Sequence, residues 1–220
     1  MKKKINVVLN ILIFAFTLLG LGIMLYLNGD DGGLLSSAGW DNMKYFTVLS
    51  NLFCGIVAGI FLLLQLLGNK KTSPAHVGGS LLSPAWMMIL KLSAAAAVMV
   101  TFLVVACFFG PLYGYRYMYL GSNLWFHLII PLLGMIEFCL LDGTIPFRMT
   151  FLAGTPALVY GCFYLGNILI NGKGKWPDTN DWYGFLNWGW GPAFVIFAVI
   201  ILTSWGAACL LRVFNKLVKI

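Results

Sequence analysis

Two residues of this chain have the types and the placement that nucleophilic chemistry requires. His127 lies within the apolar run 123–131, and Thr47 lies in the run 44–51, at the start of another apolar stretch. A hydroxyl nucleophile needs a base within hydrogen-bond reach, and imidazole is the usual base near neutral pH. The pair predicts a threonine nucleophile activated by a histidine, provided that the fold brings the two side chains together.

The composition places this chemistry in a membrane. Of the 220 residues, 60% are hydrophobic and 10% are charged, and the mean hydropathy is +0.90. Such a chain is an integral membrane protein. Its apolar runs are unbroken, whereas the strands of a barrel would alternate polar and apolar residues. We expect an all-α integral membrane protein, with residues 1–220 forming a single transmembrane domain.

Six apolar runs have about the ~20 residues that a bilayer core requires. They cover residues 5–27, 45–67, 86–109, 123–141, 150–170 and 190–212. The first follows three lysines, as a secretory signal would, but it exceeds the ~7–15 apolar residues of a signal core. We therefore expect an uncleaved first helix and a six-helix transmembrane bundle with both termini on one side.

The basic residues indicate which side faces the cytoplasm. One predicted side carries Lys2, Lys3, Lys4, Lys70, Lys71, Lys91, Arg148, Arg212, Lys216 and Lys219. The other has Lys44, Arg116, Lys173 and Lys175 beside Asp30, Asp31, Asp41, Asp178 and Asp181. The first side, with both termini, is then cytoplasmic. The net charge of +7 is explained by this topology and by contact of the basic residues with anionic lipid headgroups, so no nucleic-acid partner is expected. Short loops and a basic tail favour a bacterial plasma membrane.

Helical geometry places Thr47 and His127 at one depth near the outer interface. Both of their spans run from outside to inside, and each residue lies roughly 5 Å below its helix start. Ser50 and Asn51 lie one turn below Thr47, and Asn123 lies one turn above His127. The predicted catalytic pair therefore has three neighbours that are candidates to support it or to polarise a carbonyl.

Structural interpretations compete with the catalytic one. A threonine in a membrane helix usually bonds back to a carbonyl one turn earlier, and asparagines often join helices. Glu137 lies about 15 Å deeper than His127 by helical rise. It is either a protonated packing acid or a partner for Lys91, whose side chain we expect to reach the cytoplasmic surface.

No cofactor and no metal are predicted. The five cysteines lie in predicted spans without CxxC spacing or a nearby histidine cluster: Cys54, Cys107, Cys139, Cys162 and Cys209. We expect reduced packing residues, because one buried histidine leaves too few ligands for zinc or bis-histidine haem. Gly55 and Gly59 form a GxxxG pattern, which is typical of a helix-packing surface.

These residues resemble the androgen-induced family of multi-pass membrane threonine hydrolases and its bacterial relatives. The resemblance depends on the run Lys-Tyr-Phe-Thr at 44–47, on Asn123, His127 and Glu137, and on Asp-Trp-Tyr-Gly-Phe-Leu at 181–186. That last segment is similar to the family's Trp-Tyr-Pro-Phe-Leu loop. The resemblance implies hydrolysis of fatty acid esters of hydroxy fatty acids by a nucleophilic Thr47 with His127 in the membrane.

The chain also departs from the family pattern. A proline follows His127 by four residues where five are expected, Ser50 stands in place of an acid, and Gly184 replaces a proline. We expect a lipid ester hydrolase whose substrate is a membrane lipid or lipid ester; the sequence does not indicate which protein partners it has. The alternatives are a small-solute or proton-coupled transporter or channel with His127 and Glu137 in a polar path, and a scaffold with a polar core.

Overall fold

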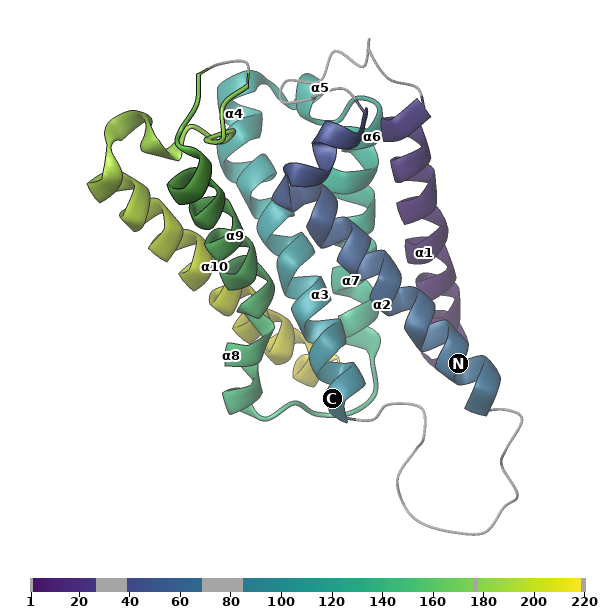
Figure 1. Cartoon of the computed structure of the whole chain (residues 1–220). Helices are drawn as coiled ribbons and strands as arrows, with labels where there is room; N and C mark the ends of the chain where they lie inside the picture. The colour runs from purple at the N-terminus through teal and green to yellow at the C-terminus, as the bar shows by residue number, and fades with distance from the viewer. Residues whose placement is uncertain (1, 27–38, 69–84, 176–177, 219–220) are drawn as a thin grey trace.

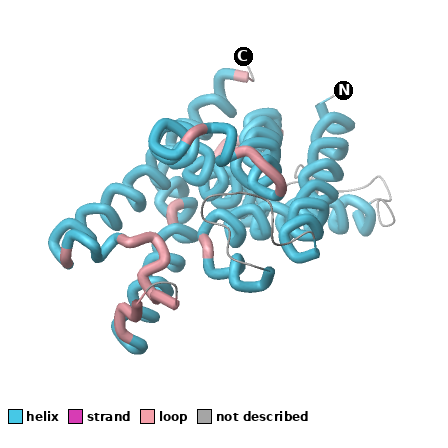
Figure 2. The backbone as a smooth tube through the Cα atoms, turned by 90° about the horizontal axis from the view of Figure 1, so that it is seen from above, coloured by secondary structure: helices cyan, strands magenta, loops and turns pink. Residues whose placement is uncertain are grey.

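The computed structural model describes residues 2–26, 39–68, 85–175 and 178–218. These residues form helices and connecting loops gathered into one bundle, with no strand among them (Figure 2). Six helical stretches are long and apolar enough to cross a membrane: Lys4–Tyr26, Phe46–Leu67, Ala85–Tyr113, Ser122–Leu140, Phe147–Asn171 and Trp190–Leu217. The predicted all-α fold with six spans is confirmed, and the spans support a multi-pass integral membrane protein.

The first half of the chain contains α1 (Lys2–Tyr26), the 3₁₀ turn η1 (Gly39–Lys44), α2 (Phe46–Gly68) and α3 (Ala85–Val104). The third span continues through the π-helical turn η2 (Val105–Phe109) into α4 (Gly110–Tyr113), and α5 (Tyr115–Met118) follows. The third span was predicted to end at residue 109, but it extends to Tyr113. The helix continues through Pro111 because this proline lies in the first turn of α4, where its missing N–H is tolerated.

The second half begins with α6 (Ser122–Leu124), the π-helical turn η3 (Trp125–Ile129) and α7 (Ile130–Leu140), which together form the fourth span. The fifth comprises the 3₁₀ turn η4 (Phe147–Met149), α8 (Thr150–Ala153) and α9 (Thr155–Asn171). The 3₁₀ turn η5 (Phe185–Trp188) precedes α10 (Trp190–Leu217). The start of α1 and the end of α10 lie at the same end of the bundle, opposite α4, α5 and α6 (Figure 1).

The helix α3 lies at the centre of the bundle and contacts α2, α7, α8, α9 and α10. Its residues from Ser93 to Val98 are all buried, and the four alanines among them let neighbouring backbones approach closely. Small side chains also bring α1 and α2 together. A methyl group at Gly55 would lie 2.6 Å from Thr17 Oγ1, and one at Gly59 would lie 3.1 Å from the Phe14 ring. The GxxxG pattern is therefore a helix-packing surface, as predicted.

All five cysteines are free. Several residues used to orient the chain, Asp30, Asp31, Lys70, Lys71 and Lys219, lie outside the described residues.

Candidate active site

His127 lies in the π-helical turn η3, immediately before α7. The Ile130 N–H donates to the Trp125 carbonyl five residues earlier, which widens the helix by one residue. Pro131 is the physical cause, because it has no N–H and its ring crowds the carbonyl four residues before it, that of His127. Turns of this kind occur frequently at functional sites. Sequence reasoning noted the proline but did not predict the widened turn.

The ring of His127 is held by a backbone carbonyl. Its Nδ1 lies 2.7 Å from the Met118 oxygen, and the side chain is only 7% exposed. A carbonyl can only accept, so Nδ1 carries the proton, and in the neutral ring Nε2 is left with its lone pair. This is the tautomer that a general base acting through Nε2 requires. Met118 was not predicted, because a backbone carbonyl leaves no signal in the sequence.

Thr47 is half-buried at the second position of α2. Its hydroxyl and its own N–H have no hydrogen-bond partner within the part of the chain that the structure describes. The other N–H groups at this helix start, those of Phe46, Val48 and Leu49, all donate to oxygen atoms. Thr47 therefore combines a free hydroxyl with a free N–H at the positive end of a helix dipole.

Asn51 connects the turn that carries Thr47 to the turn that carries His127. Its Nδ2 donates to the Thr47 carbonyl at 2.7 Å and to the Phe126 carbonyl at 2.9 Å. Turning the amide over would set its oxygen against two carbonyls, which fixes its orientation. Both amide hydrogens are used, so Asn51 does not donate to a substrate oxygen. Its buried Oδ1 has no partner among the described residues.

Ser50 is the other hydroxyl near Thr47, and it is occupied. Its Oγ lies 3.1 Å from the Thr47 carbonyl and 3.1 Å from Thr101 Oγ1 on α3. Because the carbonyl only accepts, Ser50 gives it the single hydroxyl proton and accepts from Thr101. The side chain is also buried. Of the two hydroxyls, Thr47 is the one available for chemistry.

The predicted cluster is brought together only in part. Asn123 is half-buried on α6, one turn before His127, and among the described residues its side chain forms no hydrogen bond. No hydrogen bond joins Thr47 Oγ1 to His127 within the described structure. The two residues are connected instead through Asn51, which bonds to the Thr47 and Phe126 carbonyls.

A loop between α9 and α10 covers the start of α2. The Tyr183 hydroxyl accepts from the Phe46 N–H at 2.9 Å, next to Thr47. Burial raises the pKa of Tyr183 well above its ordinary value, so this hydroxyl stays neutral. Asp181 anchors the loop: its carboxylate accepts from the Tyr164 hydroxyl and, at 3.0 Å, from the Leu186 N–H. The aromatic segment 181–186 thus positions the start of α2, which carries Thr47.

Glu137 lies apart from this cluster, in a buried polar group within the bundle. Lys91 Nζ lies 3.2 Å from Glu137 Oε1, and the two side chains are 4% and 2% exposed. Asn10 Nδ2 donates to Glu137 at 2.8 Å, while Lys91 donates to Asn10 Oδ1 and lies 4.7 Å from the Phe61 ring centroid. The expectation that Lys91 reaches the cytoplasmic surface is wrong, because partners inside the bundle satisfy its charge. The alternative of a Lys91–Glu137 pair is confirmed.

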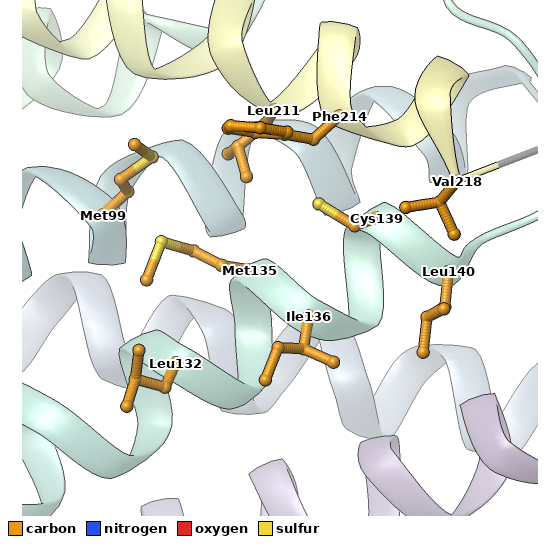
Figure 3. Close-up of a pocket in the computed structure, with 9 residues that line it drawn as sticks. All are labelled: Met99, Leu132, Met135, Ile136, Cys139, Leu140, Leu211, Phe214 and Val218. Atoms are coloured by element: carbon orange, nitrogen blue, oxygen red, sulfur yellow. The ribbon is translucent and has the colours of Figure 1, made fainter.

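An apolar groove of about 410 Å³ lies between α3, α7 and α10. It is lined by Met99, Leu132, Met135, Ile136, Cys139, Leu140, Leu211, Phe214 and Val218 (Figure 3). It follows α7 away from His127 and includes none of the predicted site residues.

Comparisons with protein-family models, with curated proteins and with solved structures gave no match for this chain. The resemblance to the androgen-induced family therefore stays a prediction, and function has to be inferred from the geometry of the site.

Proposed function

We propose that this protein is a membrane-embedded lipid ester hydrolase with Thr47 as nucleophile and His127 as general base. The observation that carries the proposal is the hydrogen bond from His127 Nδ1 to the Met118 carbonyl at 2.7 Å. It leaves Nε2 as the proton acceptor, on a turn that Asn51 joins to the turn of Thr47. A free hydroxyl and an oriented imidazole at one depth are the parts that acyl transfer to threonine needs.

In the acylation step, the Thr47 hydroxyl oxygen bonds to the ester carbonyl carbon while its proton passes to His127 Nε2. The tetrahedral intermediate then breaks the bond to the alcohol, which takes the proton from the imidazolium. The products are an acyl-threonine and the free alcohol, and water releases the acid by the reverse proton transfers. The Met118 carbonyl keeps its hydrogen bond to Nδ1 throughout.

The Thr47 N–H is the proposed donor to the negative oxygen of the intermediate. Among the described residues it has no hydrogen-bond partner, it lies at a helix N-terminus, and it belongs to the same residue as the proposed nucleophile. Asn51 is excluded because both of its amide hydrogens are used. The aromatic loop at 181–186 lies beside this helix start, where an ester at headgroup depth could enter sideways from the outer leaflet. The family resemblance favours fatty acid esters of hydroxy fatty acids, and the loop lengths favour a bacterial plasma membrane.

Activity profiling of the purified protein tests the proposal. A fluorophosphonate probe should label Thr47, as located by mass spectrometry, and the protein should hydrolyse at least one member of a lipid ester panel. Ser50→Ala is the matched control, since it removes a hydroxyl one turn away while leaving Thr47 intact. Labelling that survives in Thr47→Ala but disappears in Ser50→Ala would show that the wrong hydroxyl is assigned.

A proton-coupled transporter is the second candidate, and the buried Lys91–Glu137 pair favours it. Proton flux into liposomes, together with absent labelling of Thr47, would favour transport over hydrolysis. Hydrolysis without flux would exclude it.

A further inference from the structure

Lys44 is a half-buried cation three residues before Thr47, at the end of η1. Its Nζ lies 5.7 Å from the Tyr45 ring centroid and 5.9 Å from that of Trp182. Among the described residues, the ion pairs are those of Lys91 with Glu137 and of Lys173 with Asp181, so no carboxylate pairs with Lys44. The ammonium is held by aromatic faces and keeps its donors available.

Tyr160 fixes both sides of this arrangement. Its hydroxyl donates to the Lys44 carbonyl at 2.7 Å and accepts from Trp182 Nε1 at 3.0 Å. The backbone of Lys44 and the ring beside its ammonium are therefore tied to one atom of α9. A cation held in place this way has already lost much of the freedom that binding an anion would otherwise cost.

We propose that Lys44 binds an anionic group of the substrate, so that the enzyme acts on esters that also carry a carboxylate or a phosphate. This inference depends on the hydrolase proposal and names the substrate class of that same site. Lys44 and Thr47 are three residues apart across the bend at Tyr45, so their backbones lie within about 11 Å of each other and the anion lies near the ester carbonyl. The aromatic faces of Tyr45 and Trp182 adjoin the apolar part of the substrate.

The test compares three esters with the same acyl chain, whose alcohol part ends in a carboxylate, a phosphate or a methyl ester. Lys44→Gln loses a charged hydrogen bond to the anion. Its preference for the anionic esters over the methyl ester, measured as a ratio of kcat/KM values, should therefore fall about tenfold or more, mainly through a higher KM for the anionic esters. Lys44→Arg should keep the preference. The matched control is Lys175→Gln, which removes an exposed cation from the loop between α9 and α10. Fluorophosphonate labelling of Thr47 reports whether each variant is folded.

Binding of ether analogues, which cannot be hydrolysed, separates this inference from the hydrolase proposal. If Lys44→Gln still hydrolyses esters with the full preference for anionic ones, the proposed role of Lys44 is wrong and the hydrolase proposal is unaffected. If the protein hydrolyses no ester but binds the carboxylate or phosphate ethers tightly, and only when Lys44 is present, the hydrolase proposal is overturned and the anion site is supported. Stronger binding of the phosphate ether identifies a phospholipid headgroup as the source of the anion, and stronger binding of the carboxylate ether identifies a fatty acid.

Discussion

At the scale of single residues, His127 differs from many catalytic histidines in having a neutral partner. A carbonyl sets the tautomer as well as a carboxylate does, but it does not carry the charge that would stabilise an imidazolium. In the proposed mechanism, the Thr47 N–H would then supply much of the stabilisation of the intermediate.

The first prediction concerns this pair. His127→Ala and Thr47→Ala should each abolish ester turnover, Thr47→Ser should retain part of it, and the double variant should be no worse than either single one, because the two residues act as a unit. Turnover of purified protein and its thermal midpoint are the measurements. Losses that add in the double variant would mean that the two residues do not act in one step.

The second prediction concerns Asn51, which connects the two turns. Asn51→Leu removes the donor to the Thr47 and Phe126 carbonyls. Small misplacements of reacting groups are costly, so turnover should fall about tenfold or more with little change in KM. Stability should fall by about 1–3 kcal/mol as buried carbonyls lose a donor. Asn123→Leu, which loses no such bond, is the control; equal losses in both variants would contradict the connecting role of Asn51.

At the scale of elements, two spans widen into a π-helical turn just before a proline, at η2 before Pro111 and at η3 before Pro131. The ring of each proline removes an N–H and crowds the carbonyl four residues earlier. In η3 that carbonyl belongs to His127 itself. The proline thus sets the local helix geometry at His127, the proposed general base.

The third prediction follows from this cause. Pro131→Ala restores an N–H opposite the His127 carbonyl and favours a regular α-helix over the π-helical turn. A regular helix has no extra residue in this turn, and each residue of a helix turns it by about 100°, so the direction of the His127 side chain should change by about that angle. Turnover should fall at least about tenfold, while the thermal midpoint should stay the same or rise. Pro111→Ala, the same change in η2, is the matched control. Full activity in Pro131→Ala would mean that the proline does not set the direction of His127.

The sequence was sufficient for the spans because about twenty apolar residues in a row leave few alternatives in a bilayer. Helical rise also predicted Thr47 and His127 at one depth, and the hydrogen bonds of Asn51 join the turns that carry them. The sequence could not predict Met118, whose contribution is a backbone oxygen, nor the use of both hydrogens of Asn51. Lys91 was misplaced for a related reason: a lysine near a helix end reaches the surface unless neighbouring helices supply partners, and hydropathy does not show which helices are neighbours.

At the scale of the whole molecule, the candidate site and the buried Lys91–Glu137 pair form separate polar clusters inside the bundle. Thr47 is in the first turn of α2 and His127 directly precedes α7, whereas Lys91 lies in the first half of α3 and Glu137 in the second half of α7. The start of α2 lies toward the end of the bundle that carries α4, α5 and α6 (Figure 1). The second cluster joins α1, α3 and α7 through Asn10. Of the two alternatives expected for Glu137, the structure has the pair with Lys91, so the main effect of this cluster should be on stability.

The fourth prediction tests that role. Glu137→Gln keeps the size of the side chain but leaves a buried ammonium unpaired, which should cost about 3–5 kcal/mol of stability. Lys91→Met combined with Glu137→Gln should recover part of this loss, because neither charge remains. Protein that stays folded should still hydrolyse esters. A folded Glu137→Gln protein that has lost turnover as completely as His127→Gln would place Glu137 in the working site instead.

The last prediction concerns orientation, on which the entry of substrate from the outer leaflet depends. If the excess of basic residues marks the cytoplasmic side, single cysteines at Arg116 and Lys175 should react with an impermeant maleimide added outside intact cells. Cysteines at Arg148 and Lys216 should react only after the membrane is opened. All four positions are exposed, and the background is a variant without the five natural cysteines. Reaction of positions 116 and 148 from the same side would break the six-span arrangement. Reaction of 148 and 216 from outside, with 116 and 175 protected, would keep the fold but invert it and move the Thr47 site to the inner leaflet.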